Sequence, residues 1–268
     1  MSDKNEKEEH YRVNDWDVYV RQGPIMKSRD VDRFPKDFGF PAPEMTFKDN
    51  VLGLSWKQGA WSIEFTALDA LRLVQLKEPS ELRQVSFARE WKQTREHKHE
   101  DMKMLKPYDW TYYSEYQGTV QSAEEDLKLL NPSIPSSPAD EPVAIPIQEI
   151  LQAGENLWYG ETLLYEDELA DNGKSVYDVR VRVVNGHLLL LARCMVRLDN
   201  VEVRINETRV YVNLTSNVVI RDYRKKEGAY SDVLSRIPAG MDIGSQLDDA
   251  VWLSSVLPQV VHEVSRIA

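Results

Sequence analysis

The sequence V-Y-D-V-R-V-R-V-V (residues 176–184) is followed, after Asn185-Gly186, by H-L-L-L-L-A-R-C-M-V-R-L (residues 187–198). Both stretches alternate with the period of two that is typical of a β-strand, and Asn-Gly is typical of a tight hairpin turn. One face of the second stretch is entirely apolar, comprising Leu188, Leu190, Ala192, Cys194, Val196 and Leu198. The opposite face begins apolar and ends with Arg193 and Arg197, as the wall of a cleft would. The pattern predicts a long antiparallel hairpin with one buried face.

The hairpin is preceded by the acidic segment L-L-Y-E-D-E-L-A-D-N-G (residues 163–173). A calcium loop beginning at Asp167 would need an oxygen-bearing side chain at Leu169 and a distal glutamate, and the sequence has neither. A phosphate-binding loop ending at Gly173 would need a glycine at Glu168. We therefore predict a structured acidic rim at the entry to the hairpin. A hydrolase that uses the carboxylates of residues 166–171 remains an alternative.

The composition sets limits on the function. The chain has 268 residues, of which 42% are hydrophobic, and a formal net charge of −11. Such an acidic chain lacks the basic field that nucleic-acid binding requires. Cys194 is the only cysteine, so no intrachain disulfide can form, and we expect it to be a small buried side chain. No apolar run approaches the ~18 residues of a membrane span. We expect a soluble protein of the cytoplasm and also of the nucleus.

The remaining sequence predicts a mixture of strands and helices. Strands are expected at residues 16–20, 50–56, 61–65, 107–116, 201–205, 209–213 and 218–223. Helices are expected at residues 28–34, where Pro35 would stop the first one, after the capping box that begins at Thr66, at residues 81–94 and at the C-terminus around Val260, Val261, Val264 and Ile267. Residues 1–12 are expected to be a disordered tail. Residues 13–268 are expected to form a single domain with a proline-rich loop at about 131–146.

Two groups of residues are candidates for binding. Arg193, Arg197, Arg204 and Arg209 lie mostly on one side of the predicted sheet. They suit either cross-strand pairing with Asp178, Asp199 and Glu202 or a grip on the carboxylates of a partner. Asp69 stands where an acidic side chain stabilises a helix start.

Six motifs occur in order along the chain: I-M-K-S (25–28), P-E-M-x-F-x-D-N-V-L (43–52), I-E-F-x-A-x-D-A-L-R (63–72), K-P-Y-D-W-T-Y (106–112), L-Y-E-D-E-L-x-D-x-G (164–173) and R-x-N-x-T-R-x-Y (204–211). Together they resemble the TIPRL family of TOR-signalling-pathway regulator-like proteins, over roughly residues 14–240. The sequence departs from the family pattern in the proline-rich segment and after residue 240, and position 205 is isoleucine.

The resemblance implies an α/β fold of the α+β type, with layered antiparallel β-sheets flanked by helices and forming a cleft. It implies a non-enzymatic regulator, without a cofactor or metal, that binds the catalytic subunits of type 2A-like phosphatases (2A, 4 and 6) and acts in TOR signalling. Binding would restrain or remodel the catalytic subunit. The cleft would receive the acidic, aromatic C-terminal tail of the phosphatase, and other phosphatase regulatory proteins would be further partners.

The contacts that the motifs imply are Asp69, Arg204, Ile205, Arg209 and Tyr223, to which the arginine pattern adds Arg193 and Arg197. Ile205 and Tyr223 would seat aromatic side chains of the phosphatase. A small-molecule-binding β-fold, with a closed apolar pocket and no charged mouth, is a third possibility.

Overall fold

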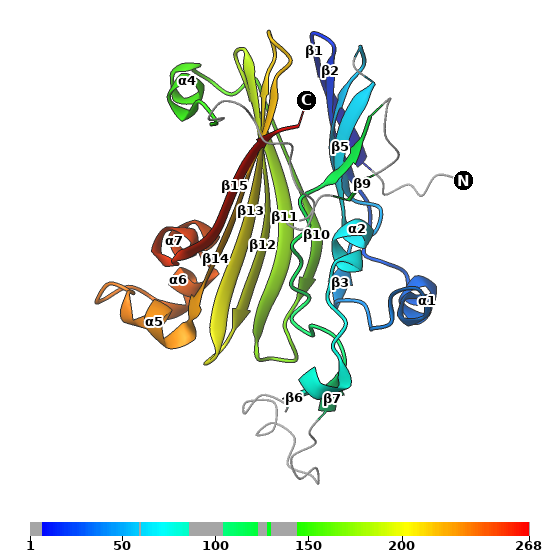
Figure 1. Cartoon of the computed structure of the whole chain (residues 1–268), viewed down its shortest axis with the longest axis vertical. Coiled ribbons are helices and arrows are strands. Elements are labelled where there is room, and N and C mark those ends of the chain that lie inside the picture. Colours follow the sequence, from blue (N-terminus) through cyan, green and yellow to red (C-terminus); the bar gives the residue numbers. More distant parts are fainter. Residues whose placement is uncertain (1–6, 59, 86–103, 123–127, 130–143, 268) are drawn as a thin grey trace.

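Two antiparallel β-sheets lie face to face in the computed structural model, with helices at the sides and ends (Figure 1). The structure describes residues 7–58, 60–85, 104–122, 128–129 and 144–267. The layered α+β fold expected from the sequence is confirmed. Much of the proline-rich segment lies outside the described residues, as do residues 86–94 of the helix expected at 81–94. The described residues Arg83–Val85 form a strand instead, so this part of the expected helix was wrong.

The larger sheet contains the hairpin that the sequence predicted. Its seven strands, in sheet order, are β15 (Gln259–Arg266), β14 (Val219–Ala229), β13 (Glu202–Asn213), β12 (His187–Leu198), β11 (Gly173–Val184), β10 (Trp158–Asp167) and β3 (Met45–Thr46). Val184 pairs with His187 across the Asn185-Gly186 turn. The six apolar residues predicted to share a face of β12 are all buried, and burial raises the pKa of the Cys194 thiol to about 11.

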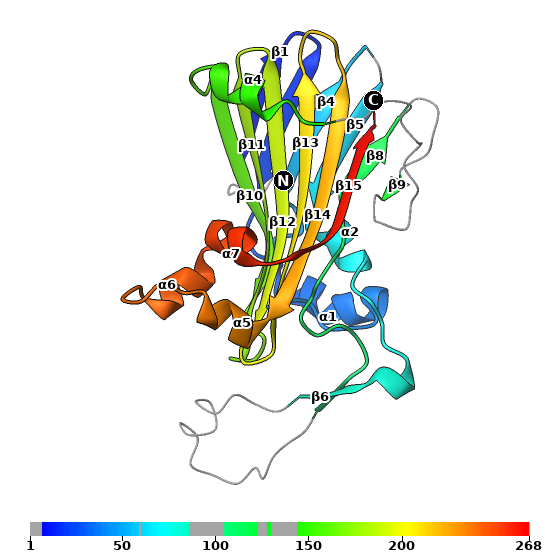
Figure 2. The ribbon, with the colours of Figure 1, turned by 60° about the vertical axis from the view of Figure 1, so that its left-hand side comes forward.

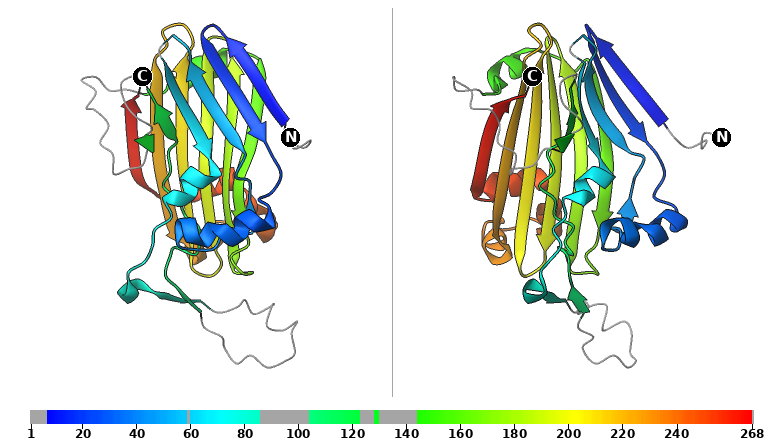
Figure 3. Two further views of the ribbon diagram at one scale, coloured as in Figure 1. Left: turned by 90° about the vertical axis from the view of Figure 1, so that its right-hand side faces the viewer. Right: turned by 45° about the vertical axis from the view of Figure 1, so that its right-hand side comes forward.

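The smaller sheet packs against the inner face of the larger one (Figure 3). Its six strands, in sheet order, are β1 (Lys7–Val13), β2 (Trp16–Gln22), β4 (Val51–Trp56), β5 (Trp61–Thr66), β8 (Thr119–Gln121) and β9 (Lys128–Leu129). A separate pair joins β6 (Arg83–Val85) to β7 (Met104–Lys106). Alternate residues such as Leu54, Ile63 and Phe65 face the larger sheet and are fully buried, because a strand with one covered face needs apolar residues only at every second position.

Residues 107–116 fill the space between the sheets but do not form the expected strand. Their aromatic side chains are buried, and their carbonyl groups accept hydrogen bonds from tyrosines of the larger sheet instead of pairing with a strand. The Tyr165 hydroxyl donates to the Tyr112 carbonyl at 2.8 Å, and the Tyr177 hydroxyl donates to the Tyr116 carbonyl at 2.9 Å. Buried backbone groups are thus satisfied without a ladder.

The helices cover both sides of the sheet pair. They are α1 (Ser28–Phe38), α2 (Ala67–Arg72), α4 (Ile147–Gln152), α5 (Tyr230–Ser235), α6 (Ile243–Asp248) and α7 (Ala250–Val256), with a 3-10 turn at Pro79–Glu81. α4 and α5–α7 lie on the outer face of the larger sheet, the face directed away from the smaller sheet (Figure 2). The first helix continues past Pro35, and the Pro35 carbonyl accepts the Gly39 amide at its C-terminus.

Three further expectations were wrong. Residues 7–12, expected to be disordered, belong to β1, and residues 259–266, expected to be helical, form β15, where β-branched valines complete the sheet edge. The two strands expected at 201–205 and 209–213 are one strand, β13. Its polar middle is tolerated because Asn206 donates to the Ser114 carbonyl at 2.9 Å and Glu207 pairs with Arg193.

The contacts of His10, where β1 pairs with β2, predict that the stability of the fold depends on pH. His10 Nδ1 lies 3.1 Å from Asp17 and Nε2 lies 3.0 Å from Glu8, and these hydrogen bonds, the one to Asp17 first, raise the pKa of His10 above 6.5. A histidine whose pKa is higher in the folded than in the unfolded state stabilises the fold at pH values below its unfolded-state pKa. This stabilisation is lost as the pH rises through the folded-state pKa. We expect wild type to exceed His10→Gln in unfolding free energy by about 0.5 kcal/mol near pH 6, because the site is partly exposed to solvent.

The measurement is urea denaturation of both proteins between pH 5.5 and 9. The difference should shrink towards zero at alkaline pH. A constant or growing difference would show that protonated His10 does not hold β1 in place.

Candidate functional site

The outer face of the larger sheet carries two apolar clusters with charged residues between them. At one end, Ile205 and Met195 are covered by the helices α5–α7. At the other end, Tyr211 and Ile220 pack with Ile150 of α4. The views of Figures 1 and 2 agree in placing these helices at separate ends of the same face. The strip between them is lined by charged side chains, of which Arg209 and Arg224 keep solvent contact.

A buried ion-pair cluster occupies the middle of this strip. Arg193 and Glu207 are paired across β12 and β13, and the guanidinium donates from two nitrogens to one carboxylate oxygen at 3.0 and 2.7 Å. Arg209 donates to the other oxygen at 2.8 Å. Burial raises the pKa of Glu207, but the charges of Arg193 and Arg209 outweigh burial, so the net pKa is lowered. The cluster holds a carboxylate inside the protein instead of offering a free cation pair.

A second charged row lies on β14. Asp222 bonds the Arg224 guanidinium at 2.9 Å through both oxygens, and this pairing raises the pKa of Arg224. The Lys226 amine donates to Ser254 of α7, and burial lowers the pKa of Lys226. These contacts tie the helical end to the strip.

The four predicted arginines are divided between the two faces. Arg193, Arg197 and Arg209 lie on the outer face, whereas Arg204 lies on the inner face, stacked on the Tyr113 ring at 4.2 Å. Arg204 donates to Thr111 at 2.6 Å and lies 3.3 Å from Glu202.

Cross-strand and neighbouring carboxylates therefore occupy the arginines. Arg197 pairs with Asp199 at 2.9 Å and Asp248 at 2.6 Å. Of the carboxylates expected to pair with these arginines, Asp199 and Glu202 do so, whereas Asp178 pairs with Arg180. The partner of Arg193 and Arg209 is Glu207.

The structure does not gather the seven predicted residues into one site. Ile205 lies beneath α5–α7 and Tyr223 lies on the inner face, and both are fully buried, so neither can seat a partner side chain in this conformation. Burial strongly raises the pKa of Tyr223. Asp69 lies on α2, where its amide donates to Thr66 and its carboxylate accepts from Thr119 at 2.8 Å. The predicted residues that retain solvent contact are Asp69, Arg197 and Arg209.

The acidic segment forms the end of β10 and the turn that leads into β11. Asp167 is buried and accepts the amides of Leu169 at 2.7 Å and Glu44 at 3.0 Å. Leu169, Ala170 and Asp171 follow with positive φ angles. The carboxylate that the hydrolase alternative would use is thus engaged in holding this turn.

A groove that was not predicted from the sequence lies between α4 and the outer face of the larger sheet. It has a volume of about 380 Å³. Leu189 and Leu191 of β12 line it on the sheet side, and Arg180 and Arg182 of β11 lie beside them. The strict alternation of β11 and β12 already placed these four residues on one face, but nothing in the sequence showed that α4 would form the opposite wall.

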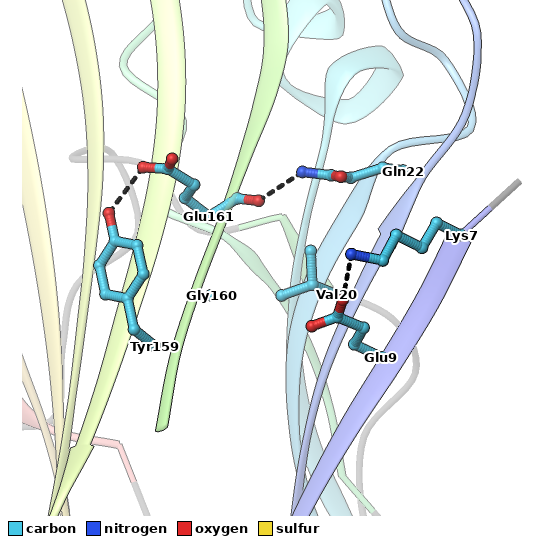
Figure 4. Close-up of a pocket in the computed structure, with 7 residues that line it drawn as sticks. All are labelled: Lys7, Glu9, Val20, Gln22, Tyr159, Gly160 and Glu161. Atoms are coloured by element: carbon cyan, nitrogen blue, oxygen red, sulfur yellow. Dashed lines mark hydrogen bonds and ion pairs between the residues drawn. The ribbon is translucent and has the colours of Figure 1, made fainter. Parts of the chain in front are cut away.

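A smaller hollow of about 170 Å³ lies at the free edge of β10 (Figure 4). Gln22 donates to the Glu161 carbonyl at 2.8 Å, and the Tyr159 hydroxyl donates to the Glu161 side chain at 2.6 Å. Lys7 pairs with Glu9 on the other side. The polar groups that line this hollow hydrogen-bond or pair with one another. The hollow is therefore the place where the edges of the two sheets meet, and we do not treat it as a binding site.

Comparison with known proteins identifies the family. The model of the TIP41-like family matches residues 45–234. The chain belongs to the TIP41-like family. The resemblance to TIPRL proteins inferred from the six motifs is thereby confirmed.

Three TIP41-like relatives show the extent of the similarity. The type 2A phosphatase activator tip41 of Schizosaccharomyces pombe is 42% identical over 98% of this chain and 99% of its own length. The type 2A phosphatase activator TIP41 of Saccharomyces cerevisiae is 34% identical over 95% of this chain and 73% of its own length. The human TIP41-like protein is 34% identical over 84% of this chain and 78% of its own length.

Among the described residues, no group of three or more His, Cys, Asp and Glu side chains is arranged to hold a metal ion. No helix in the described ranges has the length and apolar character to cross a membrane.

Proposed function

We propose that this TIP41-like protein is a non-enzymatic regulator that binds the catalytic subunit of type 2A-family phosphatases (2A, 4 and 6) in the cytoplasm, within TOR signalling. The observation that carries the proposal is the 42% identity, over nearly the whole of both chains, to a relative named a type 2A phosphatase activator. Similarity along nearly the full length of both chains favours a shared partner, because both chains then contain the same folded elements.

The surface proposed for the phosphatase is the α5–α7 end of the outer face, with the strip that adjoins it. Arg197 and Arg209 are the predicted arginines that keep solvent contact there, with side chains 17% and 25% exposed. Carboxylates of an acidic C-terminal tail would replace the exposed Asp248 on Arg197 and bind Arg209 beside Glu207, through charge-assisted hydrogen bonds. Contacts by Ile205 or Tyr223 would require the segments that cover them to move, because both are buried.

The effect on catalysis is part of the proposal. We propose that binding restrains the catalytic subunit, whereas two yeast relatives are named activators. Phosphatase activity measured with and without saturating regulator gives the sign of the effect. A rise in activity would overturn restraint and leave binding intact.

The location of the surface is tested by charge changes. In biolayer interferometry with immobilised catalytic subunit, the double variant Arg197→Glu/Arg209→Gln should bind at least tenfold more weakly than wild type, about 1.4 kcal/mol. Arg33→Glu is the matched control, because this arginine is 75% exposed and lies on α1, away from the outer face. A change below twofold in the folded double variant would place the phosphatase on another surface.

A further inference from the structure

The groove beneath α4 combines an apolar lining with solvent access. Ile147 and Leu151 of α4 are 45% and 69% exposed, and Tyr159 at the start of β10 is 46% exposed. Leu189 and Leu191 complete the apolar lining from β12. Large apolar side chains gathered around a concave surface, rather than scattered singly, mark an interaction site.

The charged residues of the groove are all positive. Arg180 and Arg182 line it, and no carboxylate does, in a chain with a formal net charge of −11. The Arg180 Nε atom donates to Asp178 at 2.8 Å and lies 3.8 Å from Glu161, and the Arg180 side chain is 47% exposed. Arg182 is exposed and has no ion-pair partner within the described part of the chain. A positively charged rim beside an apolar floor is complementary to an occupant that carries both carboxylates and an apolar side chain.

The groove borders the surface proposed for the phosphatase at Arg209 and extends from there towards α4. Leu191 of the groove is the cross-strand neighbour of Arg209, but it lies six residues from Arg197 on β12, roughly 20 Å at about 3.3 Å per residue. A protein seated over α5–α7 can therefore leave the α4 end of the face accessible.

We propose that this groove is a docking site for an extended acidic segment of a second protein partner, one that inserts a leucine- or phenylalanine-sized side chain between α4 and β12. Carboxylates on either side of that side chain pair with Arg180 and Arg182. A peptide fits better than a small apolar ligand, because the mouth is charged and the α4 wall is open to solvent. The TIP41-like protein then joins two partners at opposite ends of one sheet face.

The probe is a fluorescein-labelled ten-residue peptide with one phenylalanine, two glutamates on each side of it, and serines elsewhere. Fluorescence anisotropy with the full chain should show saturable binding with a Kd on the order of 10–100 µM. Peptides with glutamine for glutamate, or serine for phenylalanine, should each bind at least fivefold more weakly.

Protein variants locate the binding. Arg180→Glu/Arg182→Glu should raise the Kd at least tenfold, and Leu151→Asn at least fivefold, whereas Arg33→Glu should leave it unchanged. These side chains are exposed, so the variants should fold, and equal melting temperatures will verify this. Absence of saturation up to about 1 mM, or equal affinity of wild type and the double variant, would overturn the proposal.

A final titration includes the phosphatase catalytic subunit at saturation. An unchanged Kd for the peptide is the expected result. Displacement of the peptide would assign the groove to the phosphatase surface and overturn the proposal of a second partner. The first titrations contain no phosphatase, so their failure is distinct from failure of the proposed function.

Discussion

Replacement of Glu207 with alanine is expected to lower the free energy of unfolding by about 3–5 kcal/mol. Glu207 is 1% exposed and bonds both Arg193 and Arg209, so its loss leaves the buried Arg193 guanidinium without a counter-charge. Such a loss is a large fraction of the ~5–15 kcal/mol that holds a typical domain together. Urea denaturation at pH 7 measures it.

Two further variants test whether the loss of stability arises from the burial of the ion pair. Asp37→Ala breaks the exposed Arg33–Asp37 pair and should cost less than about 1 kcal/mol. Arg193→Met/Glu207→Leu removes both charges and should recover much of the stability lost in Glu207→Ala. A cost for Glu207→Ala as small as that of Asp37→Ala would show that the cluster does not stabilise the sheet.

The substitution Gly173→Ala is expected to destabilise the protein by about 2–4 kcal/mol. Gly173 begins β11 with a φ of +151°, and a Cβ atom there would lie 1.9 Å from the Arg197 carbonyl oxygen. That oxygen belongs to the backbone of β12 and cannot move without distorting the hairpin.

The matched variant is Gly186→Ala in the turn at the other end of the same hairpin. Gly186 also has a positive φ, +78°, but a Cβ there would meet nothing within 4 Å. We expect a cost of only about 1–2 kcal/mol, from the left-handed conformation alone. Thermal denaturation should rank the variants in this order, and equal losses would mean that the close approach at Gly173 is relieved at little cost.

The sequence predicted the parts of the fold in which periodicity follows burial. β11 and β12 alternate strictly because one face of each packs against the smaller sheet. Predictions failed where tertiary contacts replaced local pattern. Residues 107–116 look like a strand, yet tyrosines from distant strands bond their carbonyl groups. Residues 259–266 have helical spacing, yet β14 offers an edge that they complete.

The candidate site was harder to predict than the fold, because facing residues come from separate segments. Alternation placed Arg193, Arg197 and Arg209 together on the outer face, but their partners Glu207 and Asp248 could not be assigned from spacing. The covering of Ile205 depends on three helices some 25 to 50 residues further along the chain.

The claim that the folded chain itself binds a type 2A-family catalytic subunit has one direct test. Equimolar purified chain and catalytic subunit, each at about 20 µM, are run together on size-exclusion chromatography with light scattering, where a complex with micromolar or tighter Kd stays associated. We predict a single peak with the mass of a one-to-one complex. Two separate peaks at the masses of the free proteins, with the phosphatase shown to be active, would contradict the account.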